Sequence, residues 1–225
     1  MHDPDFGAGY LSTVRTVRDV PSTDMTEVTE SSGKGRRIGV FGGTFDPPHI
    51  GHLVAAMDAH QELELDVVLL VVANAPWQKL GERPISPAED RLEMVRAAVA
   101  GQPWLEPSDI EISRGGLSFT ADTLEHLQSE EPDAELFLIL GNDAAAGFAT
   151  WERHEEVAER ARLVVVDRPG TPTPIDDGFD WTRIDIPELE ISSTELRQRV
   201  SDGRSIRYLT PPEVVAVVED RGLYS

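Results

Sequence analysis

Short apolar runs alternate with amphipathic segments from Arg37 onward, and this alternation constrains the fold most strongly. Continuous Val, Leu and Ile runs are typical of strands buried on both faces, and strands that alternate with helices predict a parallel sheet. We therefore expect an α/β, doubly wound, Rossmann-like parallel sheet in a single domain with a helical C-terminal part. The runs are RIGVF (37–41), DVVLLVVA (66–73), ELFLIL (135–140) and RLVVVD (162–167), with weaker strand candidates near Asp109–Ser113 and Thr182–Ile186.

Residues 1–35 have a different composition, rich in Ser, Thr, Asp, Glu and Gly, and show no sustained periodicity. Such a segment buries too little apolar surface to fold, so we predict a disordered tail at 1–35 followed by a folded domain at 36–225. Met25 opens the run MTEVTESSGKGRR and is a second candidate for the start of translation. Mass spectrometry of the natively expressed protein tests this hypothesis, and an intact peptide spanning 23–25 would contradict it.

The composition narrows the compartment and the partners. The chain has 225 residues, 40% hydrophobic content, no cysteine and a formal charge of −21. No run approaches the ~18 apolar residues of a membrane helix and no secretory signal precedes the domain, so we expect a cytoplasmic protein without membrane contact. The negative charge disfavours nucleic acid as a partner, whereas a small phosphorylated substrate can still bind where a few cations gather in one cleft. The sequence leaves open whether the chain forms a homo-oligomer.

The segment after the first predicted strand reads GGTFDPPHIGHL and lies where open parallel sheets bind ligands. Gly42 and Gly43 allow close approach of a ligand to the backbone, and Gly51 keeps the turn into the next helix open. His49 and His52 then stand at a helix N-terminus, where backbone N–H groups and imidazoles can donate to the same phosphates. The segment is neither a Walker A loop nor a GxGxxG fingerprint. The alternative is a glycine-rich turn in which the histidines only cap a helix or contact solvent.

Three helix starts carry capping signals. The segments Ser86-Pro87-Ala88-Glu89 and Thr210-Pro211-Pro212-Glu213 each predict a cap, a proline in the first turn and a returning glutamate. ISSTELRQRV predicts a third start, with a capping box at 192–195 and Arg197 within the first turns. The helix that starts here offers an N-terminus able to bind anions, in addition to the N-terminus at His49 and His52. By itself, this segment would indicate an ordinary capped surface helix.

GGTFDPPHIGH, combined with ISSTELR, resembles the nucleotidylyltransferase superfamily that carries an HxGH motif, and most closely the bacterial nicotinate-nucleotide adenylyltransferases. The resemblance spans Arg37 to about Tyr224 and implies that 36–225 is a nucleotidylyltransferase domain. It implies that ATP and nicotinate mononucleotide are the substrates, in NAD biosynthesis. It assigns charge stabilisation to His49, His52, Lys79 and Arg197, and ATP contacts to Gly42, Gly43, Thr44, Phe45, Gly51, Gly141, Asp143, Ile191, Ser192, Ser193 and Thr194.

Two further segments, SRGGLSFTADTL and LGNDAAAGFATW, resemble the mononucleotide pocket of this family. The family pattern implies that Ser118, Phe119 and Thr120 hold the pyridine carboxylate and that Trp151 stacks on the pyridine ring. A half-buried core tryptophan is the alternative for Trp151. The chain departs from the family at APWQK (75–79), where Gln78 replaces a common histidine, and at Phe119, where tyrosine is common.

The expected reaction transfers the adenylyl group of ATP to the mononucleotide and releases pyrophosphate. Because the attacking phosphate is already an anion, no general base is required, and positioning and charge stabilisation supply the catalysis. The resemblance implies Mg2+ carried mainly by the ATP phosphates, and the sequence contains no dedicated metal cage, with Asp46 as an outer-shell candidate only.

Three rival interpretations remain at this point. The first keeps the fold and the chemistry but changes the acceptor to nicotinamide mononucleotide, phosphopantetheine, FMN or a phosphoalcohol. The second is a nucleotide sensor without turnover, for which we would expect loss of the histidines or of Arg197, and all three are present. The third is a class I aminoacyl-tRNA synthetase, which the chain length and the acidic surface disfavour.

Overall fold

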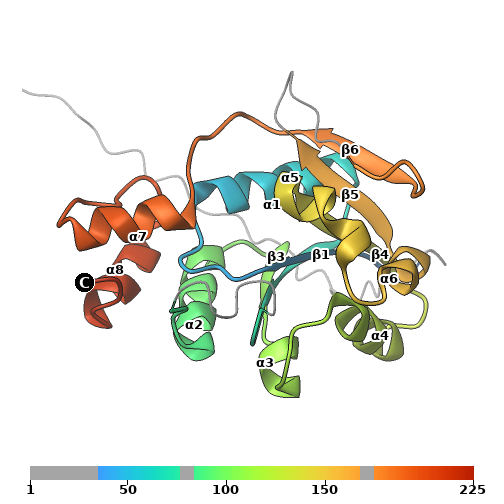
Figure 1. The fold of residues 1–225 in the computed structure, drawn as a ribbon, viewed down its shortest axis with the longest axis horizontal. Coiled ribbons are helices and arrows are strands. Elements are labelled where there is room, and N and C mark those ends of the chain that lie inside the picture. Colours follow the sequence, from blue (N-terminus) through green and yellow to red (C-terminus); the bar gives the residue numbers. More distant parts are fainter. Residues whose placement is uncertain (1–34, 77–83, 168–174) are drawn as a thin grey trace, which may run out of the picture. The chain divides into compact units, whose positions relative to one another are not determined.

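The computed structural model describes residues 35–76, 84–167 and 175–225 (Figure 1). The predicted tail at 1–35 and Met25 lie outside the described residues, apart from Gly35. Lys79 and Gln78 of the APWQK segment lie outside them as well, as does the 168–174 part of the loop between the last two strands.

The core of the fold is a six-stranded sheet in the order β3-β2-β1-β4-β5-β6, and every neighbouring pair is parallel. This order reverses direction between β1 and β4, as in a doubly wound dinucleotide-binding fold. The prediction of an α/β Rossmann-like sheet is confirmed. The strands are β1 (Arg37–Gly43), β2 (Val67–Val72), β3 (Leu105–Ser108), β4 (Glu135–Gly141), β5 (Arg162–Asp167) and β6 (Trp181–Asp185).

Successive strand residues face opposite sides of the sheet, and a separate apolar cluster covers each side. One cluster packs α1 and α2 against residues such as Val68 and Ile139, and the other packs α4 and α6 against residues such as Val40 and Leu138. The helices are α1 (Ile50–Glu62), α2 (Ala88–Val99), α3 (Ile110–Arg114), α4 (Thr120–Glu130), α5 (Asn142–Ala146), α6 (His154–Arg160), α7 (Ser193–Ser201) and α8 (Pro212–Asp220), with a 3-10 turn η2 (Phe148–Thr150).

The last two helices, α7 and α8, lie together at one end of the molecule beside α2 (Figure 1). A third apolar cluster joins them, in which Met94 and Ala98 of α2 contact Leu196 of α7 and Val214 and Val218 of α8. The fold therefore brings the C-terminal helices against the helix that follows β2. Among the described residues, no helix has the length and the apolar content needed to cross a membrane.

One strand prediction is wrong. The segment 109–113, expected as a weak strand, forms the N-cap and most of α3, and the strand at this edge of the sheet is β3, just before it. β3 contains Pro107, which an edge strand tolerates because one side of its backbone has no neighbouring strand. The alternating DIEIS pattern puts Ile110 and Ile112 against the apolar clusters from a short helix instead.

The helix starts also differ from the capping prediction at two of three places. The N-caps of α2 and α8 are Pro87 and Pro211, with no side-chain cap bond, so Ser86 and Thr210 stand outside the helices. The Thr210 hydroxyl donates instead to the Pro48 carbonyl, over 2.8 Å. The third start agrees with the prediction, since Ser192 caps α7 and its hydroxyl accepts from the Glu195 N–H at 3.1 Å.

Candidate active site

A cavity of about 460 Å³ opens at the carboxyl ends of β1 and β4, where the strand order reverses. This position is where open parallel sheets bind ligands. Gly42 is the second-last residue of β1 and Gly141 is the last residue of β4, and a Cβ added at either would meet no atom within 4 Å. Nine of the residues singled out by the sequence line this cavity: Gly42, Gly43, Thr44, Ser118, Phe119, Thr120, Gly141, Asp143 and Trp151.

The loop after β1 packs around the aromatic ring of Phe45. Phe45 is buried and has a left-handed φ of 49°, an uncommon conformation for a non-glycine residue. A Cβ on Gly43 would lie 2.7 Å from the Phe45 ring, so only glycine fits at this position. The ring also contacts the His52 imidazole edge to face, with centroids 5.1 Å apart. The loop sequence therefore fixes where the second histidine lies.

The two imidazoles lie at the N-terminus of α1 and stack on each other. His49 is the N-cap residue, and its ring centroid lies 3.7 Å from that of His52, with 29° between the planes. The His49 backbone N–H donates to His52 Nδ1 over 3.1 Å. Since Nδ1 accepts, the neutral His52 ring carries its proton on Nε2, which makes Nε2 a hydrogen-bond donor. Gly51 leaves room for this arrangement, because a Cβ there would lie 3.1 Å from His49 Nδ1.

Burial lowers the pKa of His49 from its ordinary value of 6.5 to about 4. Its Nδ1 is buried and has no hydrogen-bond partner among the described residues. At neutral pH the His49 ring is therefore uncharged in the free protein, and it can act on a phosphate as a neutral donor.

This pKa shift makes folding stability depend on pH. Because the folded pKa is the lower one, the unfolded chain binds more protons between about pH 6.5 and pH 4, and the free energy of unfolding falls as pH falls through that window. We expect protonation of His49 to lower the free energy of unfolding by about 2–3 kcal/mol between pH 7 and pH 4.5. Urea unfolding of wild type and His49→Gln at both pH values measures it. Equal losses of stability in the two proteins would contradict the assignment.

The N-terminus of α7 is bonded directly to the histidine loop. The Ser193 hydroxyl donates to the Pro47 carbonyl over 2.8 Å, and Arg197 Nη1 donates to the Asp46 carbonyl over 2.7 Å. Arg197 Nη2 also donates to the Thr194 hydroxyl, over 3.0 Å. The guanidinium and the imidazole pair thus lie on the same side of the molecule, as convergence on one ligand requires. Ile191 packs against the cluster formed by α2, α7 and α8.

The polar atoms of the cavity include three that are buried and have no hydrogen-bond partner among the described residues. These are Glu111 Oε2, Ser118 Oγ and Trp151 Nε1. Buried polar atoms are usually satisfied, so a ligand or water inside the cavity is expected to bind them. The charged lining residues that the structure describes are all acidic, namely Glu111, Asp143 and Glu152. Glu111 has no site signal in the sequence, because its segment has the alternating pattern of a strand.

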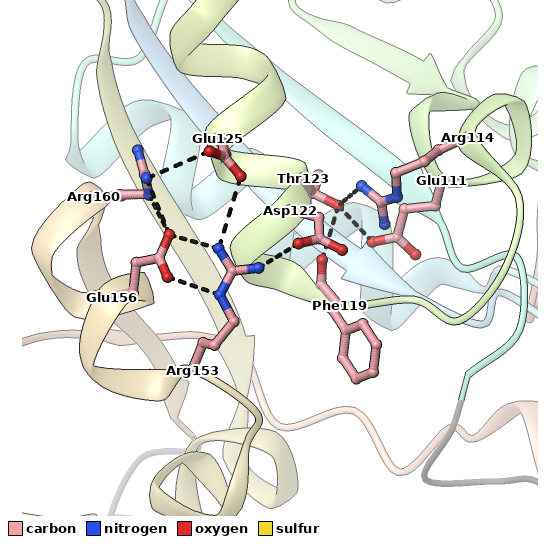
Figure 2. Close-up of polar contacts among 9 residues, drawn as sticks. All are labelled: Glu111, Arg114, Phe119, Asp122, Thr123, Glu125, Arg153, Glu156 and Arg160. Carbon is pink, nitrogen blue, oxygen red and sulfur yellow. Dashed lines mark hydrogen bonds and ion pairs between the residues drawn. The ribbon is translucent and has the colours of Figure 1, made fainter.

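Figure 2 shows how α4, whose N-terminus borders the cavity, is held from two sides. On one side the Thr123 hydroxyl donates to Glu111 Oε1 over 2.9 Å. On the other, Arg153 pairs with Asp122 of α4 and binds Glu156 of α6 through two N–H groups, both over 2.7 Å. The hydrogen bond from Arg153 lowers the pKa of Glu156 to about 2, so this carboxylate stays charged at neutral pH.

Arg91 of α2 is a second site-supporting residue without a sequence signal. Its side chain is only 1% exposed, and its guanidinium donates to three backbone carbonyls, those of Ser86 (2.9 Å), Thr44 (2.9 Å) and Asn74 (3.1 Å). Asn74 in turn donates to the Gly116 carbonyl over 2.8 Å, just before Ser118. One buried cation thus connects the loops that follow β1 and β2. A basic residue in an amphipathic helix gives no sequence signal of such a role.

No group of three or more His, Cys, Asp or Glu side chains gathers as a metal site in the part of the chain that the structure describes. Asp46, the outer-shell candidate, is buried, and its Oδ1 accepts a 2.8 Å hydrogen bond from the Tyr224 hydroxyl. The position of Lys79 lies outside the described residues.

Comparison with known proteins shows the family to which the chain belongs. The family model described as cytidylyltransferase-like matches residues 40–199. A relative from Thermus thermophilus, named "Probable nicotinate-nucleotide adenylyltransferase", is 46% identical over 188 residues, which are 84% of this chain and 99% of the relative. The chain belongs to this adenylyltransferase family. A relative of the same name from Exiguobacterium sibiricum is 42% identical over 189 residues, again 84% of this chain and 99% of the relative.

A solved structure of a nicotinate-nucleotide adenylyltransferase family protein has the same fold. It is the Plasmodium falciparum nicotinic acid mononucleotide adenylyltransferase, complexed with NaAD, with a TM-score of 0.67 and 19% sequence identity. The match covers 84% of this chain and 97% of that one. At this identity the match supports the fold alone, and the relatives carry the family assignment.

Proposed function

We infer that the chain transfers the adenylyl group of ATP to nicotinate mononucleotide, forming nicotinate adenine dinucleotide and pyrophosphate, in NAD biosynthesis. The names of its bacterial relatives agree with this acceptor. The observation that carries the proposal is the hydrogen bonding of α7 to the histidine loop beside the cavity, which puts His52 and Arg197 on one side of the molecule. The cytoplasmic location expected from the composition remains a prediction.

The charges of the site indicate which part of the substrates binds in the cavity and which part binds at the N-termini of α1 and α7. The charged side chains among the described lining residues are all acidic, which disfavours a multiply charged triphosphate inside the cavity, so we assign the cavity to the pyridine ring and sugars. The N-termini of α1 and α7, with the imidazoles and Arg197, suit the triphosphate. The nicotinate carboxylate then binds at the N-terminus of α4, at Ser118, Phe119 and Thr120, and Asp143 accepts from ribose hydroxyls.

In this mechanism an oxygen of the mononucleotide 5′-phosphate attacks the α-phosphorus of ATP in line. The new O–P bond forms as the bond from the α-phosphorus to the bridging oxygen breaks, and pyrophosphate leaves with that electron pair. His52 Nε2–H, a neutral His49 and the Arg197 guanidinium stabilise the charge that develops on the phosphoryl oxygens. We assign Lys79 to the same charge, and Thr44 and the Ser193 segment to supporting contacts. Mg2+, carried mainly by the ATP phosphates, would neutralise part of their charge when bound.

One assay tests the proposed function. The purified chain is incubated with ATP, magnesium and either nicotinate mononucleotide or nicotinamide mononucleotide, and pyrophosphate release is followed. We expect release with the nicotinate form, and a preference for it in kcat/KM. Release only with another phosphorylated acceptor would change the substrate, and binding of ATP without any release would support the sensor alternative.

Trp151 gives a test of the cavity half of the site. Its ring lines the cavity and packs on Phe148, with centroids 5.6 Å apart. Because stacking acts on the bound substrate and the transition state alike, Trp151→Ala should raise the KM for the mononucleotide roughly tenfold or more, with kcat within about twofold. Trp151→Phe, which keeps a ring, should restore most of the affinity. Steady-state kinetics at saturating ATP measure both constants. If Trp151→Ala lowers kcat and leaves the KM for the mononucleotide unchanged, Trp151 only supports the fold.

A further inference from the structure

Tyr224, which follows α8, is a partly buried titratable residue that the mechanism above does not use. Its hydroxyl donates to Asp46 Oδ1 over 2.8 Å and lies 3.7 Å from the Met94 sulfur. Burial and the neighbouring Asp46 carboxylate raise the pKa of the Tyr224 phenol, so it remains protonated and remains a donor. Asp46 itself is 1% exposed.

The backbone around Tyr224 is fixed by contacts that orient this side chain. Gly222 has a φ of 60° and reverses the backbone after α8, a common way for a helix to end. The Leu223 N–H donates to the Val218 carbonyl over 3.0 Å, and Arg221 pairs with Asp90 and Glu93 of α2. The end of α8 is thus fixed on α2, with the tyrosine turned toward the histidine loop.

Asp46 is the residue at which three distant segments meet. Its side chain accepts from Tyr224, and its backbone carbonyl accepts from Arg197 Nη1 at 2.7 Å. Three residues further on, His49 begins the turn into α1 that contains the imidazole pair. A group that fixes Asp46 therefore acts on both parts of the proposed triphosphate site.

We propose that Tyr224 is a positioning residue for adenylyl transfer, which holds Asp46 so that the imidazole pair and Arg197 keep their relative placement around the ATP phosphates. Tyr224 does not line the cavity, and its effect is transmitted through the Asp46 carboxylate. This inference rests on the proposed function and deepens it. It predicts that removing one hydroxyl group weakens the use of ATP and leaves the mononucleotide site intact.

The test uses Tyr224→Phe, which keeps the ring and loses only the hydroxyl. We expect kcat/KM for ATP to fall about tenfold, the scale of one hydrogen bond to a charged group, with the KM for the mononucleotide within about twofold. Tyr208→Phe is the matched control, since Tyr208 is 95% exposed and should behave as wild type. A variant that melts at a lower temperature but keeps wild-type kinetics well below its Tm would make Tyr224 merely structural and overturn the proposal.

A second background tests the route through Asp46. In an Asp46→Ala protein the hydroxyl has no carboxylate to bind, so adding Tyr224→Phe should change kcat/KM less than about twofold. An equal loss in both backgrounds would overturn the proposal. Titration calorimetry with ATP gives a readout without turnover, and Tyr224→Phe should weaken binding there too. If wild type and Tyr208→Phe release no pyrophosphate, the proposed function fails; if they are active and Tyr224→Phe matches them in kinetics and ATP affinity, only this inference fails.

Discussion

Replacing His52 with alanine is expected to lower kcat by about 10²–10³-fold, the scale reported when one preorganised donor to a developing charge is removed. The structure gives the reason. His52 lies in the first turn of α1, its Nδ1 is occupied by the His49 N–H, and its ring is packed between His49 and Phe45. The orientation of Nε2 is therefore set before substrate binds, and a donor fixed in advance needs no reorganisation during the reaction.

Two further proteins make the His52 experiment specific. His52→Asn can keep an acceptor for the His49 N–H but shortens the side chain, so it should fold like wild type and still lose most of the rate. His126→Ala removes an exposed imidazole on α4, outside the cavity, and should leave kcat unchanged. Steady-state turnover and circular dichroism are measured on all three. A folded His52→Ala protein with wild-type kcat would remove this residue from the mechanism.

Replacing Arg91 with methionine is expected to lower the free energy of unfolding by about 3 kcal/mol or more. Methionine fills much of the same volume but leaves the carbonyls of Ser86, Thr44 and Asn74 without their buried donor, and each such loss costs about 1–3 kcal/mol. Since Thr44 and Asn74 belong to the loops that border the cavity, kcat/KM should fall as well. Urea unfolding measures the first effect and the pyrophosphate assay measures the second.

Arg96 on the same helix is the matched control for Arg91. Its side chain is exposed, and the nearest oxygen of its ion-pair partner Asp109 is 4.0 Å away. Arg96→Met should therefore change stability by no more than about 0.5 kcal/mol. Similar losses in the two variants would show that the carbonyl contacts of Arg91 contribute little.

The fold was predictable because buried parallel strands have a strong sequence signal. RLVVVD was placed at 162–167, where β5 runs, and ELFLIL was placed one residue short of β4. The edge strand β3 was not predicted, because LEPS is short and contains Pro107. A strand was predicted instead for the following segment DIEIS, because its apolar residues alternate. An edge strand pairs on one side only, so its residues face weaker constraints and leave a weaker pattern.

Within the site, motif residues were predictable and supporting residues were not. The histidine loop and ISSTELR lie in short contiguous motifs, whereas Arg91 and Tyr224 have partners as far as 47 and 178 positions away in the sequence. Arg91 binds backbone carbonyls, which every residue provides, so no pairing pattern marks it. Thr210 was read as a cap because a threonine before two prolines fits that motif, yet its hydroxyl binds Pro48. The roles assigned to individual site residues remain predictions.

A crystal structure of the protein with nicotinate mononucleotide and a non-hydrolysable ATP analogue tests the central claim most directly. We expect the pyridine ring to lie in the cavity against Trp151 and the triphosphate to lie within hydrogen-bonding distance of both His52 Nε2 and Arg197. A triphosphate bound inside the acidic cavity, or remote from the N-termini of α1 and α7, would contradict it.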